Sequence, residues 1–178
     1  MRTSLTFAVA SSSPAGLARE ELASLYPHTG ERWHQKMDRC LCLVTVRHEG
    51  RLIAAGIVHD SVLAPTESMD ALELGCMAVH PAFRKLGIRE RVTALRLERA
   101  RALGGTPITV IDAANPASWA FYERSDAWER ERVFEQDETT KFIYRALREP
   151  RRAPAPILVP SSSVAPKVDS QVLAVPAL

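Results

Sequence analysis

The segment from Leu72 to Arg91 constrains the fold of this 178-residue chain more than any other. Its first eight residues form an apolar run typical of a strand, Pro81 marks a turn, and a basic loop opens a helix at about Gly87. The start of a helix presents free backbone N–H groups and the positive end of the helix dipole, and both favour phosphate. Three basic side chains gather there: Arg84, Lys85 and Arg89. The segment therefore predicts a site for a nucleotide-like or pyrophosphate-bearing ligand.

The same residues resemble motif A of the GNAT superfamily of acyl-CoA-dependent N-acyltransferases. That motif is a strand ending in Val-x-Pro, then Gln/Arg-x-x-Gly-x-Gly/Ala, then a helix. Here Val79-His80-Pro81 precedes Arg84-Lys85-Leu86-Gly87-Ile88-Arg89, so the Arg and the central Gly match. Two positions depart from the motif: Lys85 stands where a Gly is often found, and Arg89 replaces the last Gly or Ala. A long side chain at position 89 would either crowd a pyrophosphate or pair with it.

A second match lies downstream. The segment from Asn115 to Arg124 is similar to motif B of the family, Asn-x-x-Ala/Ser-x-x-x-Tyr-Glu-Lys/Arg. The glycine that usually follows is absent, although an aromatic residue arrives at Trp128. The two motifs occur in the family's order, with a helix and a strand expected between them. The resemblance covers residues 40–146 and implies the GNAT fold: a mixed, mostly antiparallel sheet flanked by helices, with splayed fourth and fifth strands.

Composition narrows the other possibilities. A chain of this length predicts one domain, and a net charge of +2 gives no overall preference for nucleic acid or an anionic membrane. Later arginines of the helix after Gly87 are expected on a solvated face: Arg96, Arg99 and Arg101. An odd number of cysteines gives no disulfide framework, and buried thiols are expected at Cys40, Cys42 and Cys76. The five histidines form no ligand pair, so no metal site is predicted.

The N-terminus carries one apolar stretch, Leu5–Ala10. Its six residues fall short of the roughly 7–15 of a signal-peptide core. Elsewhere no run approaches the roughly 20 apolar residues that span a bilayer. We therefore predict a cytoplasmic protein without a membrane partner.

Periodicity and turn signals give the expected order of elements, β-α-(α)-β-β-β-α-β-α-β-β, an α/β layer fold. The expected strands are Ser4–Ala10, Leu41–Arg47, Leu52–Val58, Leu72–Val79, Pro107–Ile111 and a closing antiparallel pair containing Val133 and Lys141–Ala146. The expected helices run from Ser13-Pro14 to about Leu25, from Gly87 to about Leu103 and from Pro116 to Arg124, with residues 28–38 a short helix or a loop. Gly50 is expected at a hairpin turn.

We predict one acyltransferase domain over residues 1–148. The composition shifts after it, because six of the 29 residues from Pro150 to Leu178 are proline. This tail, residues 149–178, is predicted to be disordered. The alternative is that Val168–Leu178 docks on a partner or on the same chain.

Acyl transfer to an amine requires a held thioester, a polarised carbonyl and two proton transfers. The resemblance implies that the basic loop holds acetyl-CoA and that a backbone N–H near Met77–Val79 faces the carbonyl oxygen. Motif B adds a pantetheine contact at Asn115, which is also placed to cap a helix. The implied cofactor-binding residues are Met77, Ala78, Val79, Arg84, Lys85, Leu86, Gly87, Ile88, Arg89, Asn115 and Ser118.

Tyr122, the tyrosine of motif B, is the predicted general acid, since a phenol with a pKa near ~10 keeps its proton at neutral pH. The alternative is core packing. Glu73 is the predicted general base, expected on one strand face with Gly75, Met77 and Val79 and with a pKa raised by desolvation. A structural carboxylate or a water chain is the alternative, and two weaker candidates lie in the preceding loop: Asp70 and Glu67.

The leading hypothesis is an acetyl-CoA-dependent N-acetyltransferase that acts on a small-molecule or peptide amine. Two alternatives follow from the altered loop: a long-chain acyltransferase using acyl carrier protein, and a GNAT-fold binding module without catalysis. A homodimer is possible, and nucleic acid is not an expected partner. The acceptor side is expected in residues 26–38, 60–70 and 135–139, with four side chains facing a cationic amine: Glu31, Trp33, Asp38 and Glu67.

Overall fold

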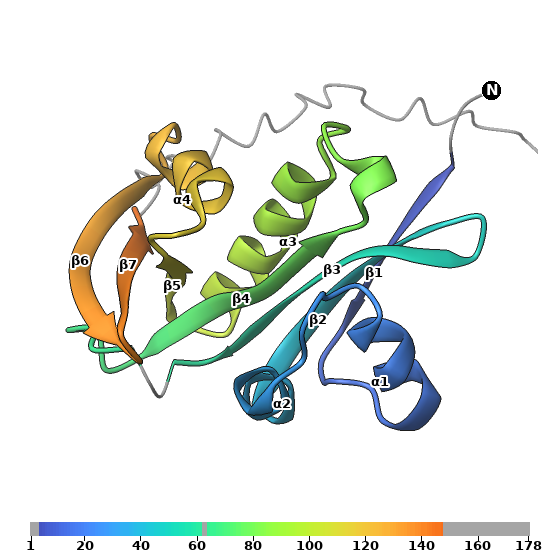
Figure 1. Cartoon of the computed structure of the whole chain (residues 1–178), viewed down its shortest axis with the longest axis horizontal. Helices are drawn as coiled ribbons and strands as arrows, with labels where there is room; N and C mark the ends of the chain where they lie inside the picture. The colour runs from blue at the N-terminus through green and yellow to red at the C-terminus, as the bar shows by residue number, and fades with distance from the viewer. Residues whose placement is uncertain (1–3, 62–63, 148–178) are drawn as a thin grey trace, which may run out of the picture. The chain divides into compact units, whose positions relative to one another are not determined.

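The computed structural model describes residues 4–61 and 64–147, which form one seven-stranded sheet and its covering helices (Figure 1). The strands are β1 (Leu5–Ala10), β2 (Cys40–His48), β3 (Arg51–Asp60), β4 (Ala71–Val79), β5 (Thr106–Asp112), β6 (Trp128–Gln136) and β7 (Thr139–Ala146). The helices are α1 (Gly16–Ala23), α2 (Glu31–Asp38), α3 (Ile88–Ala102) and α4 (Pro116–Glu123), with a 3-10 turn η1 (Pro81–Phe83) before α3.

The strand order is β1-β2-β3-β4-β5-β7-β6, and every neighbouring pair is antiparallel except β4 and β5. The parallel pair extends only from Ala71–Glu73 of β4 to Thr106–Ile108 of β5. Beyond that point β4 has a strand neighbour on the β3 side alone. The predicted fold class, including the splayed fourth and fifth strands, is confirmed.

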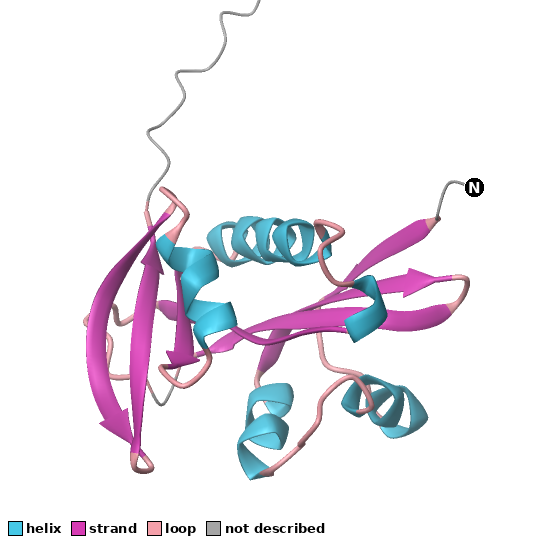
Figure 2. Cartoon of the chain, turned by 45° about the horizontal axis from the view of Figure 1, so that its top comes forward, coloured by secondary structure: helices cyan, strands magenta, loops and turns pink. Residues whose placement is uncertain are grey.

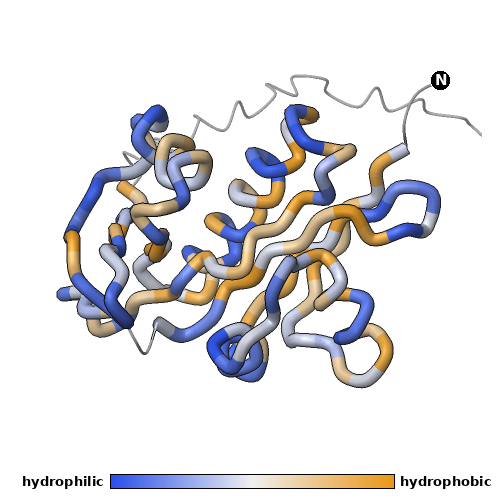
Figure 3. Tube along the Cα trace, in the orientation of Figure 1, coloured by the Kyte–Doolittle hydropathy of each residue, from blue (hydrophilic) through white to orange (hydrophobic). Residues whose placement is uncertain are grey.

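Helices cover both faces of the sheet. Helices α3 and α4 lie on one face and α1 and α2 on the other (Figures 1 and 2). A core cluster with Val44, Leu74 and Val92 fills the α3 face, and a second with Leu22, Met37 and Ile57 fills the α1–α2 face. Figure 3 shows hydrophobic colours along the central strands and hydrophilic colours along β6. The sheet is thus buried at its centre, where β4 parts from β5.

A β-bulge interrupts β4 at its midpoint. Gly75 pairs with Ile57 and Ala78 pairs with Ala55, so two residues of β4 oppose the single Gly56 of β3. The first of these two residues is Cys76, with a φ of 49°. A bulge bends its strand and removes local ladder bonds. It also shifts the alternation of side chains by one residue, so the residues of β4 after the bulge lie on the opposite face of the sheet from the one that strict alternation predicts.

Local signals explain most boundaries. The β2–β3 turn has Glu49 and Gly50 at φ values of 50° and 81°, as a two-residue hairpin requires, and the predicted turn is confirmed. The predicted start of the first helix is wrong: α1 begins at Gly16, after Ala15, and Ser13 donates instead to the carbonyl of Pro14. The prediction for the tail concerns residues outside the described ones. None of the helices in residues 4–61 and 64–147 combines the length and the apolar character needed to span a membrane.

Candidate active site

The loop between β4 and α3 has the backbone of an anion-binding turn. Gly87, the N-cap of α3, has a left-handed backbone with a φ of 72°. It provides no side-chain cap, so no capping side chain accepts a hydrogen bond from the first N–H groups of α3. Lys85 is also left-handed, at a φ of 63°, where the family often has glycine. Arg84, Lys85 and Leu86 are exposed, whereas Ile88 is buried in the core. The loop can therefore offer backbone donors and two cations to a pyrophosphate.

Arg89 turns away from this loop and lies against α4. Its guanidinium donates to the carbonyls of Ala117 (3.0 Å) and Ser118 (3.1 Å). The Cζ atom lies 4.4 Å from the ring centroid of Phe121, in a cation–π contact. The side chain therefore ties the first turn of α3 to α4, and it neither fills the loop nor extends across it.

Asn115 caps α4, because its Oδ1 accepts a hydrogen bond from the backbone N–H of Ser118 at 3.2 Å. The cap role anticipated from Pro116 is thus observed. Asn115 is exposed, so its amide group is accessible to a ligand. Both backbone groups of Ser118 are hydrogen-bonded: its N–H donates to Asn115, and its carbonyl accepts from Arg89. These residues place the start of α4 next to the N-terminus of α3.

Three successive carbonyls of β4 accept hydrogen bonds from side chains of other elements. The carbonyl of Leu74 accepts from Thr109 Oγ1 (3.0 Å), and that of Gly75 from Arg96 Nη1 (3.0 Å). The carbonyl of Cys76 accepts from the Tyr26 hydroxyl (2.5 Å). These bonds fix the bulge where β4 leaves β5, next to the predicted oxyanion donors Met77, Ala78 and Val79. A fixed backbone donor is what polarisation of a carbonyl requires.

Arg96 is fully buried, so its expected place on a solvated helix face is wrong. It falls on the stripe of α3 that contains Ile88, Val92 and Ala100, and this spacing faces the sheet. Its guanidinium also donates to Thr93 Oγ1 (3.2 Å). Burial lowers the pKa of this guanidinium. The helical spacing signalled its position, but the charge suggested solvent.

Tyr122 is 2% exposed and packs in an aromatic group. Its ring stacks on Tyr144 at a centroid distance of 5.6 Å and meets Trp128 edge-on at 4.9 Å. Its hydroxyl makes no hydrogen bond to another described residue. The core packing anticipated as the alternative is therefore observed, and the role of general acid stays a prediction. Because the hydroxyl is uncommitted within residues 4–61 and 64–147, it can donate to a ligand.

Glu73 is 4% exposed and lies on the α1–α2 face. Its Oε1 accepts from Lys36 Nζ at 2.5 Å and lies 3.5 Å from His59 Nε2. Burial by itself would raise the pKa of the Glu73 carboxyl. The charge of Lys36 and the contact with His59 outweigh this effect and lower the pKa to about 2. The expected raised pKa is therefore wrong, because Lys36 comes from α2, far away in the sequence. Glu73 as the base stays a prediction.

The expectation that Glu73 shares a face with Met77 and Val79 is also wrong. Met77 and Val79 pack against the core on the α3 face, whereas Cys76 packs against the core on the α1–α2 face. The bulge at Cys76 adds one residue to the strand, so every later side chain is on the opposite face.

A cavity of about 260 Å³ opens beside Glu73 on the α1–α2 face. It is lined by Arg32, Trp33, Lys36, Ala64, Glu73, Cys76, Val110, Asp112, Phe134, Gln136 and Lys141. Burial raises the pKa of the Cys76 thiol to about 11, so this cysteine is a poor nucleophile. Since both β4 and β5 contribute to the wall, the cavity lies where the two strands separate.

None of the three acidic residues expected to face the acceptor lines this cavity. Asp38 pairs with Arg19, Glu67 pairs with Arg132, and Glu31 accepts from Gln35. Trp33 lines the cavity, and its contact with an amine stays a prediction.

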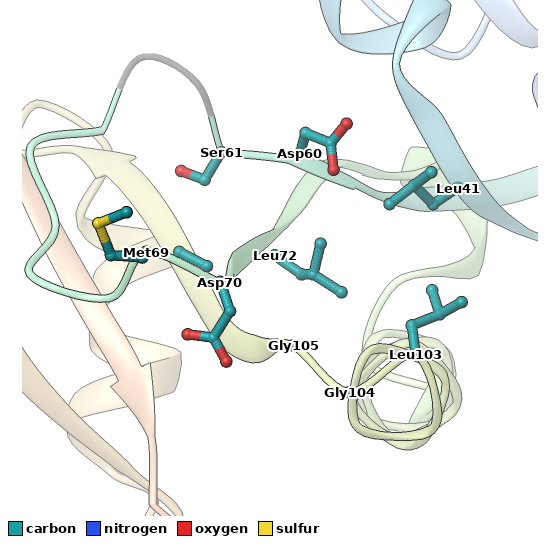
Figure 4. A pocket seen from close by; sticks show the side chains of 10 residues that line it. Leu41, Asp60, Ser61, Met69, Asp70, Leu72, Leu103, Gly104 and Gly105 are labelled. Carbon is teal, nitrogen blue, oxygen red and sulfur yellow. The ribbon is translucent and has the colours of Figure 1, made fainter.

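The weaker base candidate Asp70 accepts from Thr106 at 3.1 Å and lines a separate hollow of about 540 Å³ near the start of β4 (Figure 4). The three thiols are free, with Cys40 and Cys42 buried and Cys76 partly buried. No group of three or more potential ligand side chains for a metal occurs within residues 4–61 and 64–147.

Comparison with known proteins agrees with this geometry. The sequence model of the acetyltransferase (GNAT) family matches residues 12–127. No curated protein matches the chain by sequence. The chain therefore belongs to the GNAT acetyltransferase family, whose members transfer acyl groups from acyl-CoA.

Several solved structures share the fold. The ribosomal-protein-S18-alanine N-acetyltransferase from Escherichia coli is 14% identical, with a TM-score of 0.58 over 82% of this chain and 98% of that one. An acyl-CoA N-acyltransferase from Pseudomonas aeruginosa is 16% identical, with a TM-score of 0.57 over 81% and 100%. A GNAT family acetyltransferase from Elizabethkingia anophelis with acetyl-CoA bound is 11% identical, with a TM-score of 0.57 over 80% and 97%. At these identities the similarity shows the fold alone.

Proposed function

We propose that this protein is an acetyl-CoA-dependent N-acetyltransferase that transfers the acetyl group directly to a primary amine in a ternary complex. The observation that carries the proposal is the opening between β4 and β5. The start of α3, which has no side-chain cap, follows β4 after η1 and the basic loop, and α3 lies on one face of the sheet. The 260 Å³ cavity lies on the other face, and the bulged edge of β4 stands between them. Two substrates that approach from opposite faces would meet there.

The residues of the loop fit a pyrophosphate-bearing co-substrate. The first N–H groups of α3 and the exposed cations Arg84 and Lys85 would hold the phosphates. The side chain of Arg89 lies on α4, so it leaves the loop open. The Asn115 amide would contact the pantetheine arm, and a backbone N–H of Met77–Val79 would face the thioester oxygen.

The proposed reaction combines one acyl transfer with two proton transfers. The amine nitrogen bonds to the thioester carbon, and the carbon–sulfur bond breaks. Glu73, directly or through water, would take the proton that the amine loses, and Tyr122 would give a proton to the leaving thiolate. A pKa of about 2 makes Glu73 a weak base while Lys36 is bound to it. Movement of the Lys36 ammonium away from Glu73 would raise the basicity of this carboxylate.

Both alternative functions started from the departure of the loop from the glycine pattern, in which Arg89 replaces the last glycine. Its bonds to Ala117 and Ser118 weaken that argument, so neither an acyl-carrier donor nor a degraded binding module is favoured. The amine partner, a homodimer and a cytoplasmic location stay predictions from the sequence.

The test is calorimetric titration with acetyl-CoA and, in parallel, with a long-chain acyl-CoA. Micromolar binding of acetyl-CoA, followed by thiol release in the presence of amines, would support the proposal. Binding of the long-chain compound alone would overturn it in favour of a long-chain acyltransferase. Failure of both to bind would move the weight to a carrier-protein donor or a non-catalytic module.

A further inference from the structure

The cavity beside Glu73 has a wall of paired charges. Three cations line it, Arg32, Lys36 and Lys141, together with two carboxylates, Glu73 and Asp112. Lys141 Nζ donates to Asp112 Oδ2 at 2.5 Å, and Lys36 Nζ donates to Glu73 Oε1 at 2.5 Å. Arg32 lies at the rim and pairs with Asp137, which is outside the wall. Each of the three cations of the wall is therefore already paired with a carboxylate.

The pair of Lys36 and Glu73 restricts what can enter. Glu73 is almost fully buried, whereas the Lys36 side chain is 28% exposed and faces the cavity. An entering ammonium would bind Glu73, because this carboxylate is placed at the separation of β4 and β5. It would then displace the ammonium of Lys36. A monocation would leave two positive groups beside one carboxylate in a desolvated place, which is costly.

A zwitterion avoids this cost. Its ammonium binds Glu73 and its carboxylate binds Lys36. One ion pair is thus replaced by two, and the net charge of the cavity does not change. Arg32 lies at the same rim and can reinforce the carboxylate contact.

The remaining walls are apolar. Trp33 comes from α2, whereas Ala64, Val110 and Phe134 pack against one hydrophobic cluster, so a modest apolar group can be covered. The volume of about 260 Å³ is just below the roughly 300–1,000 Å³ of sites for drug-sized ligands. The acceptor must therefore be small.

We infer that the acceptor is a free α-amino acid with an apolar side chain, whose ammonium binds Glu73 and whose carboxylate binds Lys36. This inference rests on the proposed function, since it names the substrate class of the same site. It replaces the cationic acceptor expected from the sequence.

The test compares matched acceptors with acetyl-CoA as the donor: leucine and phenylalanine, their amides, their decarboxylated amines, and a dipeptide beginning with each. Thiol release gives kcat/KM for each compound. We expect the free amino acids to exceed the amides, amines and dipeptides by at least about tenfold. Equal or better rates with compounds that lack the carboxylate would overturn the inference.

Variants separate recognition from folding. Lys36→Met should lower kcat/KM for the amino acids about 10–100-fold and change that for the decarboxylated amines by much less. Lys36→Arg keeps the charge and should restore part of the loss, which also identifies any folding defect of Lys36→Met. Arg39→Met, an exposed cation three residues away and outside the cavity wall, is the matched control and should leave all rates unchanged.

Calorimetric titration with acetyl-CoA tests the proposed function independently of the acceptor. If acetyl-CoA binds and only carboxylate-free amines react, the acetyltransferase stands and the amino-acid acceptor is wrong. If acetyl-CoA does not bind, the proposed function fails, and the inference fails with it.

Discussion

The guanidinium of Arg96 occupies the space that a side chain at Gly56 would need. A Cβ placed on Gly56 would lie 2.9 Å from Arg96 Cζ, closer than such contacts are found. Gly56 is the residue of β3 opposite the bulge of β4, so the missing side chain lets a cation reach the carbonyls of Gly75 and Ile57. The bulge, the glycine and the buried arginine form one arrangement.

Gly56→Ala should therefore destabilise the fold by about 1–3 kcal/mol, since the methyl group displaces a hydrogen-bonded side chain. Chemical denaturation measures this free energy of unfolding. Gly30→Ala is the control, because a Cβ there meets no atom within 4 Å. Equal stability of the two variants would contradict the role given to Arg96.

Lys85→Gly should have opposite effects on stability and on binding. Glycine relieves the left-handed strain at position 85 and should raise the unfolding free energy by up to about 1 kcal/mol. Loss of the cation should weaken acetyl-CoA binding a few-fold in low salt. Lys85→Ala loses the charge and keeps the strain, so it should bind as weakly without the gain in stability. Unchanged binding in both variants would remove Lys85 from the phosphate site.

Tyr122→Phe should lower kcat by about 100-fold or more and leave the affinity for acetyl-CoA near that of the wild type. The ring packing on Tyr144 and Trp128 is kept, so the thermal midpoint should hardly change. Tyr144→Phe is the control: it removes a hydroxyl that donates to Glu123 and should keep kcat. Normal turnover by Tyr122→Phe would exclude this residue as the acid.

Glu73→Gln should remove a pH-dependent part of the stability. The pKa of Glu73 is lowered in the folded state to about 2, below its ordinary value of 4.5. Its contribution is therefore full above about pH 4.5 and is lost as the pH falls toward 2. Denaturation at pH 7 and at pH 3 should show the wild type losing more stability than Glu73→Gln. Parallel losses would show that Glu73 is not held as a carboxylate by Lys36.

The motifs predicted the turn between β4 and α3 and the cap of α4 well, because each depends on local chemistry. Pro81 and Gly87 delimit the turn, and α3 begins one residue after the expected start, at Ile88. The ion pair in the cavity wall could not be predicted, because Lys36 and Glu73 are 37 residues apart and meet only through the packing of α2. The bulge at Cys76 escaped prediction for another reason. Gly75, an isolated glycine inside the strand, lies directly before it and is a recognised bulge signal that strict alternation ignores, so Met77 and Val79 were misplaced relative to Glu73.

The three carbonyls of the bulge have a consequence for the assembly of the protein. Their donors lie 50, 21 and 35 residues away along the chain, at Tyr26, Arg96 and Thr109. Contacts of such range close large loops and form late in folding. The turn between β4 and α3 is built from neighbouring residues and can form early. The bulged edge of β4, where we propose that the reaction takes place, is fixed only once β5, α3 and the chain after α1 have all docked.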